Sequence, residues 1–382
     1  MRVVSSVISI YSSDTAGVCS SLYELGGMTV VHDASGCNST YATHDEPRWY
    51  EGNGMVYISA LTENDAIMGN DDLFIDNVVN AAKDLDQCRF IALCGSPLPM
   101  MVGTDFDALA VEIERRIKIP VLPLHTNGIR SYLFGADESW RTFAARFCDE
   151  KDEKNLRKVN ILGATPLDFS INGQIGTIRR FLEENGFEVN SCWSMGSSFE
   201  ELCKSGNAGV NLVISSAALK LAQYLEDRFA LPYVAAVPIG NRFGKATIEA
   251  LRSSAETGRS HLLCTGAREN TGKVKIIGET VWSSSLACAL KYEANLECQV
   301  LNPLEKEFAV MKESDISVPD EDAVEEAFEG AEMIIGDPLY KPVVPENVKF
   351  IPIPHEAFSG RCFRKHIPDI IGKNFEKGFI IC

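Results

Sequence analysis

The sequence predicts three doubly wound α/β domains of the Rossmann type, each built on a parallel sheet. Short runs that are almost wholly apolar, as strands buried on both faces are, alternate with segments in which apolar residues recur every three or four positions. The second pattern is typical of amphipathic helices. With 382 residues the chain is long enough for several cores. We expect domains at 1–150, 157–262 and 272–382, with ligand sites in clefts between domains.

The first domain is expected to alternate strands with helices. Two amphipathic helices are expected, at 71–85 and 105–118. Asp71 and Asp105 suit their N-caps, because a carboxylate accepts the free N–H groups there and complements the helix dipole. The expected strands are MTVVHD (28–33), FIALCG (90–95) and IPVLPLHT (119–126).

The charged stretch 149–158 marks a boundary, because it is solvated and poor in apolar anchors. Two further strand–helix alternations follow it, which is the pattern of parallel sheets. In the second domain the expected elements are 159–165, the helix 174–186 ended by Gly186, 187–193, 211–216, 232–240 and a helix to about 258. In the third they are 273–279, the helix 282–295, 296–302, the helix 320–330, 333–338 and 348–355.

Composition excludes several classes of protein. A hydrophobic content of 45% with 23% charged residues is typical of a globular chain. A net charge of −17 argues against nucleic acid and anionic membranes as partners. The first residues lack the apolar core of a signal peptide or a membrane span. Twelve cysteines without regular spacing then indicate free or metal-bound thiols in a reducing cytoplasm. No P-loop or G-x-G-x-x-G follows a first strand, so nucleotide binding is not expected.

Three cysteines are candidate metal ligands. Cys19, Cys37 and Cys94 each have a glycine within two residues and are expected where strands give way to loops. Glycine lets the backbone approach a bulky group, and loops at strand ends are where α/β folds bind ligands. The hypothesis is an iron–sulfur cluster held by these thiolates. The alternative is that they are buried and inert, because free cysteine packs as a small hydrophobe and no C-x-x-C pair is present.

The stretch around these cysteines resembles the N-terminal domain of nitrogenase component 1 subunits, a family that includes cofactor-assembly scaffolds and tetrapyrrole reductases. The matching features are Cys19 before an apolar helix, Cys37 in VVHDASGC, the segment TENDAIMG, and Cys94 upstream of GTD (103–105). Cys94 lies three residues further from that turn than the family pattern has it. The resemblance implies a [4Fe–4S] or [8Fe–7S]-type cluster at a subunit interface, and an ATP-dependent iron–sulfur reductase as electron donor. Ser20, Ser21 and Ser96 are candidates to hydrogen-bond its sulfurs.

A second constellation lies near the end of the chain. The segment FIPIPHEAFSGRCF (350–363) resembles one in the family's catalytic subunit whose histidine ligates the active-site cofactor. This implies a catalytic role for His355 and leaves open a second metal cofactor there; a hydrogen-bonded, half-buried histidine is the alternative. Arg130, Arg242 and Lys245 are candidates for binding an anionic cofactor or substrate, with plain surface solvation as the alternative.

Two departures separate the chain from true nitrogenases. Val189 stands where the catalytic subunit has a cofactor-binding cysteine, and the family's G-H-H segment has no match. The leading hypothesis is therefore a nitrogenase-like oxidoreductase acting on an unidentified substrate, as a homodimer or as a heterodimer or heterotetramer with a related chain. The runner-up is a non-catalytic scaffold for metallocluster assembly. The third is an α/β ligand-binding protein of the periplasmic type with inert cysteines.

Overall fold

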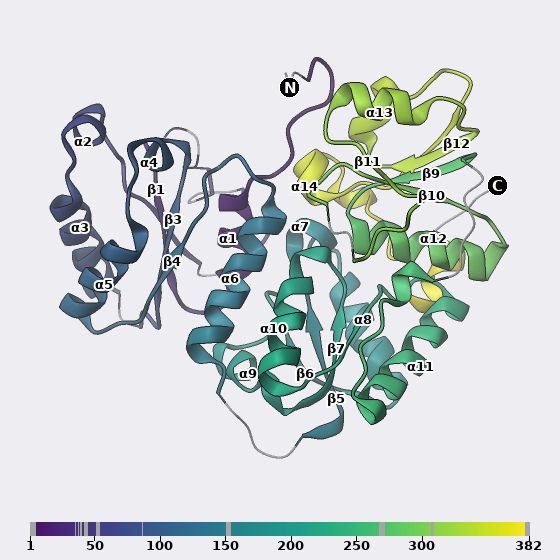
Figure 1. The fold of residues 1–382 in the computed structure, drawn as a ribbon, viewed down its shortest axis with the longest axis horizontal. Helices are drawn as coiled ribbons and strands as arrows, with labels where there is room; N and C mark the ends of the chain where they lie inside the picture. Colours follow the sequence, from purple (N-terminus) through teal and green to yellow (C-terminus); the bar gives the residue numbers. More distant parts are fainter. Residues whose placement is uncertain are drawn as a thin grey trace. The chain divides into compact units, whose positions relative to one another are not determined.

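The computed structural model describes residues 5–34, 36, 38, 40–41, 45–50, 54–85, 87–149, 154–266, 272–306 and 309–378. The chain forms two compact units. The smaller unit comprises Ser12–Cys148 and Ser194–Cys203, and the larger unit comprises Met1–Tyr11, Asp149–Trp193 and Lys204–Cys382. Figure 1 shows parallel sheets flanked by helices, which confirms the predicted fold class. The three predicted domain ranges stay predictions.

The smaller unit is built on one parallel sheet of strand order β2-β1-β3-β4. The helices α3 and α5 pack together and contribute apolar side chains to one cluster of its core, together with β1, β3 and β4. The strands are β1 (Met28–His32), β2 (Met55–Ile58), β3 (Ile91–Gly95) and β4 (Val121–Leu124). The helices are α1 (Asp14–Leu22), α2 (Glu63–Met68), α3 (Asp71–Lys83), α4 (Pro97–Val102), α5 (Phe106–Ile117), α6 (Tyr132–Phe147) and α9 (Phe199–Cys203).

The larger unit contains two parallel sheets, of order β6-β5-β7-β8 and β11-β10-β9-β12-β13. The strands are β5 (Asn155–Leu162), β6 (Glu188–Cys192), β7 (Ala208–Val213), β8 (Tyr233–Ala235), β9 (Val274–Ile277), β10 (Gln299–Asn302), β11 (Ile316–Ser317), β12 (Met333–Gly336) and β13 (Lys349–Pro352). The helices are α7 (Pro166–Phe169), α8 (Gln174–Glu184), α10 (Leu219–Phe229), α11 (Asn241–Thr257), α12 (Thr280–Ala294), α13 (Glu321–Phe328), α14 (Glu356–Ser359) and α15 (Phe375–Gly378).

The order of the strands creates a switch point in the last sheet. From β9 the chain moves outward to β10 and β11, then crosses to the other side of β9 to form β12 and β13. Connections on the two sides of such a point diverge and leave a crevice at the carboxyl ends of the strands, where α/β proteins bind ligands. The crevice here lies between the ends of β9 and β12.

The sequence patterns predicted most of the helices and strands, but not every residue at which they begin or end. Asp105 caps α5 by accepting the N–H of Ala108, as expected, and Gly186 follows the end of α8 at a φ of +87°. The expectation for Asp71 was wrong, because it is the first residue of α3 and Asn70 holds the N-cap position. The helix α6 was not predicted: it buries acidic and hydroxyl side chains among its apolar ones, which obscures the amphipathic period.

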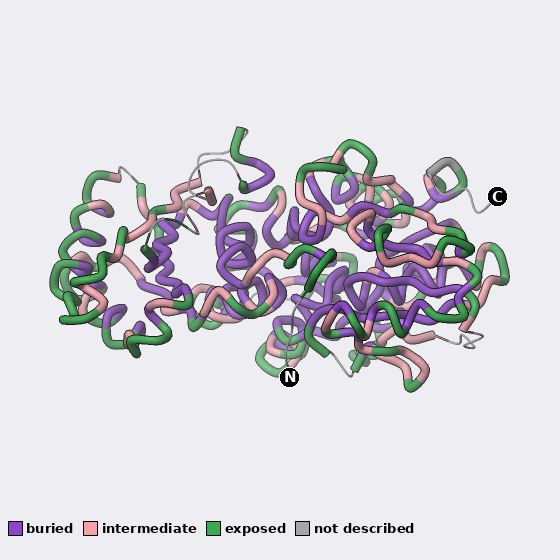
Figure 2. Tube along the Cα trace, turned by 90° about the horizontal axis from the view of Figure 1, so that it is seen from above, coloured by how far each residue is buried: buried purple, intermediate pink, exposed green. Residues whose placement is uncertain are grey.

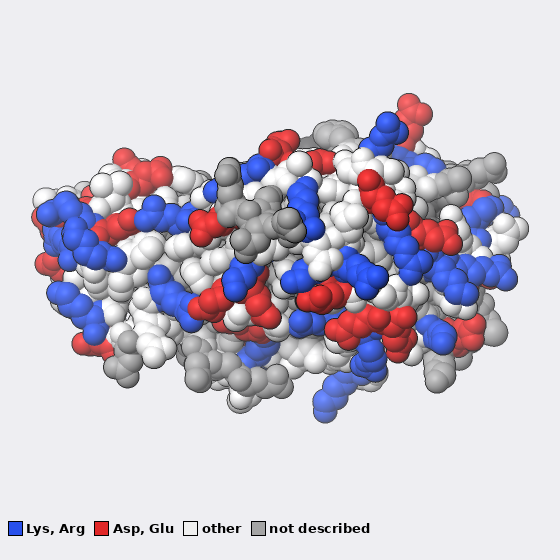
Figure 3. Space-filling model, turned by 90° about the horizontal axis from the view of Figure 1, so that it is seen from below, with Lys and Arg blue, Asp and Glu red and all other residues white. Residues whose placement is uncertain are grey.

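The surface agrees with a globular chain of mixed charge. Figure 2 shows buried trace along the strands and exposed trace along the outer helices and loops. On the face drawn in Figure 3, basic and acidic side chains are interspersed, without the continuous basic surface typical of nucleic-acid binding. Within the described residues, no helix is both long and apolar enough to span a membrane.

Candidate functional site

Two of the predicted cluster cysteines lie close together in the smaller unit. Cys19 lies in the middle of α1, which packs on β1 and β3, and Cys94 is the fourth residue of β3. The expectation that both stand where strands end was wrong for Cys19, which is helical, whereas Cys94 is the penultimate residue of its strand. Cys37 lies outside the described residues, and no group of three or more metal-ligating side chains occurs among the residues that are described.

The position of Cys19 depends on two glycines. A Cβ added to Gly17 in α1 would lie 2.1 Å from the carbonyl oxygen of Tyr132, and one added to Gly135 in α6 would lie 1.8 Å from that of Asp14. The two helices therefore touch backbone to backbone, which only glycine permits. This contact fixes α1, and Cys19 with it, against the rest of the unit.

Both thiols are fully buried, and burial is the main cause that raises the pKa of each. The charge of Glu46 adds to the effect at Cys19, and interactions with Cys19 and with nearby carboxylates add to it at Cys94. Metal or cluster binding would have to displace the protons of both thiols.

A buried polar network that the sequence analysis missed surrounds Cys19. The guanidinium of Arg48 donates from Nε to Glu46 at 2.6 Å, from Nη1 to Glu24 at 2.8 Å and from Nη2 to the Ser20 carbonyl at 2.6 Å. The Ser20 hydroxyl donates to Glu46 at 2.8 Å. The sequence offers no signal for this network, because only tertiary contacts bring Glu24 and Glu46 to Arg48.

The fit of an iron–sulfur cluster can be tested on these residues. The hydroxyl of Ser21 is buried, and the described chain offers it no hydrogen-bond partner. On α1 residues two positions apart do not face each other, so the Ser21 hydroxyl is not on the Cys19 side of the helix. Ser20 and Ser96 donate within the chain, the latter to Asp33 at 2.7 Å. The two described thiols fit the predicted cluster as part of its ligand shell.

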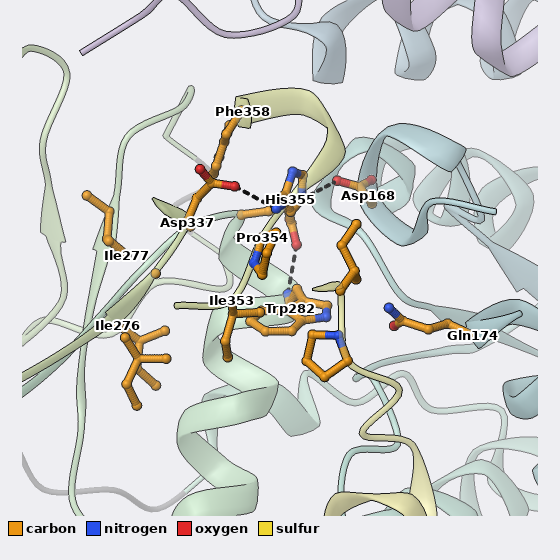
Figure 4. A pocket seen from close by; sticks show the side chains of 16 residues that line it. Asp168, Gln174, Ile276, Ile277, Trp282, Asp337, Ile353, Pro354, His355 and Phe358 are labelled. Carbon is orange, nitrogen blue, oxygen red and sulfur yellow. Dashed lines mark hydrogen bonds and ion pairs between the residues drawn. The ribbon is translucent and has the colours of Figure 1, made fainter. Parts of the chain in front are cut away.

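The second predicted site lies at the switch point of the larger unit. His355 follows β13, Asp337 follows β12 and Glu279 follows β9. Asp168 lies on α7, which follows β5 of the neighbouring sheet. Because α7 packs against α14, Asp168 lies at the same site as His355. Figure 4 shows His355, Asp337 and Asp168 converging near Trp282 and Gln174. Glu279 also lines this pocket. An acidic residue directly after an apolar run is the sequence signal that marks such positions.

Both ring nitrogens of His355 are engaged within the chain. Nδ1 accepts the N–H of Ala357 at 3.3 Å and so caps α14, which assigns the proton of the neutral ring to Nε2. Nε2 lies 3.3 Å from Asp168 Oδ1. Asp337 fixes the loop by accepting the His355 N–H at 2.6 Å and the Ser359 hydroxyl at 2.8 Å. The Phe358 ring stacks on the imidazole at 4.5 Å.

At this cluster, burial and the neighbouring negative charges shift the pKa of His355 in opposite directions. Burial lowers the pKa of His355, but the hydrogen bond and charge of Asp168, with the charges of Asp337 and Glu279, outweigh it and raise that pKa. Burial raises the pKa of Asp337 and of Glu279. Each carboxyl therefore holds its proton more tightly than it does in water.

The pocket beside His355 is small, and apolar side chains form much of its wall. It leaves about 20 Å³, enough for one water-sized molecule. Its apolar walls are Ile276, Ile277, Trp282, Ile335, Ile353 and Phe358. A second metal cofactor does not fit here, because the space is too small and the imidazole nitrogens already face Asp168 and a backbone amide.

The three predicted anion-binding cations do not line this pocket. Arg242 and Lys245 lie in the first turns of α11, where the Arg242 guanidinium donates to the Tyr292 carbonyl at 3.1 Å. Arg130 belongs to the smaller unit and stacks on the Phe134 ring at 4.0 Å. All three side chains are on exposed residues.

Comparisons with known proteins identify the family. A family model described as "nitrogenase component 1 type oxidoreductase" matches residues 25–275. The nitrogenase iron-molybdenum cofactor biosynthesis protein NifE of Sinorhizobium fredii is 25% identical over 205 residues, covering 52% of this chain and 40% of that protein. One of the subunits of the light-independent protochlorophyllide reductase of Methylobacterium sp. is 31% identical over 144 residues, covering 36% of this chain and 28% of that protein.

The fold agrees with these matches. The solved structure "Nitrogenase Cp1 at pH 6.5" superposes with a TM-score of 0.72 at 17% identity, covering 99% of this chain and 93% of that one. At this identity the likeness shows the fold alone. The matched stretches span less than half the length of the two curated relatives.

Proposed function

Because the chain belongs to the nitrogenase component 1 type oxidoreductases, we propose that it is an iron–sulfur electron-transfer component of a reductase. It accepts electrons from an ATP-dependent iron–sulfur partner and reduces a substrate that is not identified. The observation that supports this best is that Cys19 and Cys94 are both buried in the smaller unit, on α1 and on the adjacent strand β3.

Cys19, Cys37 and Cys94 are the proposed cluster ligands. A four-iron cluster is usually held by four ligands, so a fourth ligand would come from a second subunit, either another copy or a related chain. When bound, the cluster supplies one-electron redox chemistry. Both described thiols are covered by their own chain, so sharing a cluster requires the covering residues to move as subunits assemble. The cysteines lose their protons on ligation.

An exposed apolar surface on the smaller unit suits the electron donor. Ile67 and Met68 of α2 and Met101 of α4 are at least 75% exposed, and the two helices pack together. They border a cavity of about 330 Å³ lined by polar residues such as His32 and Asp65. Exposed apolar groups rimmed by polar ones are typical of protein–protein contacts. We assign the reductase partner to this surface.

His355 is the proposed catalytic residue of the larger unit. Asp168 orients the ring, and the Nδ1 atom can exchange a proton by releasing its long bond from the Ala357 amide. A reduction consumes protons with its electrons, which a titratable group at the switch point can supply. Arg130, Arg242 and Lys245 remain proposed contacts for an anionic cofactor or substrate. None of the cysteines that the structure describes forms a disulfide, which supports a cytoplasmic location.

The alternative is a scaffold on which a metallocluster is assembled. The relative from Sinorhizobium fredii, whose name refers to cofactor biosynthesis, favours it, as does the small pocket at His355. The two functions differ in turnover. A reductase component consumes reducing equivalents catalytically when its ATP-dependent partner is added, whereas a scaffold transfers its metal once.

The test is iron and acid-labile sulfide per chain on anaerobically purified protein, with an electron paramagnetic resonance spectrum after dithionite reduction. About two irons per chain indicate one four-iron cluster shared by a dimer, and about four indicate a shared eight-iron cluster or one four-iron cluster per chain. Cys37→Ala should abolish or convert the cluster, while Cys88→Ala, at a partly buried cysteine outside the proposed set, should leave it intact. Absence of iron after reconstitution would overturn the proposal.

A further inference from the structure

The pocket beside His355 carries more negative than positive charge. Asp168, Glu279 and Asp337 line it with His355, and no lysine or arginine is among its lining residues. Even with the imidazole protonated, three acidic side chains face one cation. Among the described lining residues, no further cationic side chain is present to balance them.

Hydrogen bonds hold two of these carboxylates without neutralising them. Glu279 caps α12, accepting from Val281 at 3.0 Å and Trp282 at 2.7 Å, and also accepts the N–H of Ser216 at 2.8 Å. Asp337 accepts from the backbone of His355 and from the Ser359 hydroxyl. These N–H and O–H groups are dipoles without net charge, so they supply no counter-charge to the pocket.

An independent feature points to a missing ligand. Gln174, the first residue of α8, is 3% exposed, and its amide points into the pocket in Figure 4. Its Oε1 has no hydrogen-bond partner among the described residues. A buried amide oxygen without a donor is destabilising, and a donor placed in the pocket would satisfy it.

Size and chemistry then limit the occupant. The pocket admits one water-sized group, offers oxygen acceptors at Gln174 and Asp168, and has the Trp282 ring in its wall. An ammonium group is of that size, donates several hydrogen bonds, and is attracted by carboxylates and by the face of an aromatic ring. No set of three metal-ligating side chains is found among the described residues, which disfavours a divalent metal ion.

We propose that this pocket binds an ammonium group, either the free ion or the head of a small primary amine, between Asp168, Gln174 and Trp282. The inference rests on the pocket alone and stands even if the proposed electron-transfer function fails. It adds a cation-binding site to the larger unit.

The test is a titration of the full chain with ammonium or methylammonium chloride, against tetramethylammonium chloride at equal ionic strength. The readouts are the melting temperature and the Trp282 indole N–H signal, assigned with Trp282→Phe. A saturable response to the small ions, absent with tetramethylammonium, is expected. If methylammonium binds more tightly than ammonium, an amine head is the ligand; the reverse order identifies the free ion. No saturable response to either ion overturns the proposal.

Substitutions of the pocket residues test whether the cation binds at this site. Asp168→Asn removes a negative charge and Gln174→Leu removes an acceptor, so each should weaken cation binding by at least about tenfold. Glu188→Gln, which alters a carboxylate that is 64% exposed on β6, should leave binding unchanged. Equal binding by all three variants would place the cation elsewhere and overturn the assignment.

A lysine side chain placed in the pocket provides a second, independent test. Gln174→Lys would bring its own ammonium into the pocket, and Gln174→Met is the neutral control of similar length. The lysine variant should melt at least as high as the methionine variant and no longer respond to ammonium. A lower melting temperature for the lysine variant would show that the pocket rejects a cation, because an unpaired buried charge is strongly destabilising.

Discussion

The substitution Gly135→Ala tests how the fold positions Cys19. The new Cβ would lie 1.8 Å from the Asp14 carbonyl oxygen and 2.7 Å from its carbon. Ordinary contact requires α1 and α6 to separate by roughly 1.5 Å. Overpacking of this kind costs about 1–3 kcal/mol. Because α1 carries Cys19, reconstituted iron content should fall together with stability.

The assay is urea unfolding followed by the fluorescence of Trp140, a fully buried residue of α6, with iron measured on the same preparations. The matched control is Gly176→Ala in α8, where an added Cβ meets nothing within 4 Å. That variant should be more stable by about 0.4–1 kcal/mol, because alanine restricts the unfolded chain. If Gly135→Ala unfolds at the same urea concentration as the unsubstituted protein, the close helix contact does not determine the position of α1.

Three further predictions concern other parts of the chain. Arg48→Met leaves Glu46 buried without its partner and should lower the free energy of unfolding by about 3–5 kcal/mol, measured by the same urea assay; an unchanged midpoint would contradict the network. The folded pKa of His355 lies above 6.5, so the stability that this group contributes is complete below pH 6.5 and is lost as pH rises through the folded pKa. His355→Gln should therefore show a smaller loss of melting temperature on that rise, and an identical pH profile would refute the ion pair with Asp168. Met101→Asp, at an exposed position of α4, should slow electron transfer from the reductase without changing iron content, whereas Val111→Asp, exposed on α5, should not.

Sequence patterns predicted the parallel-sheet architecture because its signals are local. Strands buried on both faces must be apolar throughout, and runs such as 90–95 and 333–338 show this directly. The amphipathic period likewise found α3 and α5. It failed at α6, where Asp137 and Glu138 are buried among apolar residues. The segments around Cys37 and His355 carried the family resemblance for the same local reason.

Tertiary structure alone decided what surrounds the candidate residues. Asp168 and Glu279 meet His355 because two sheets place their strand ends at one point, and no local pattern encodes that meeting. The orphan oxygen of Gln174 became visible only once its neighbours were known. Cys19 proved helical because Gly17 and Gly135 let two helices touch. Local periodicity thus determined the elements, while packing between distant segments determined charge, burial and hydrogen bonding at both sites.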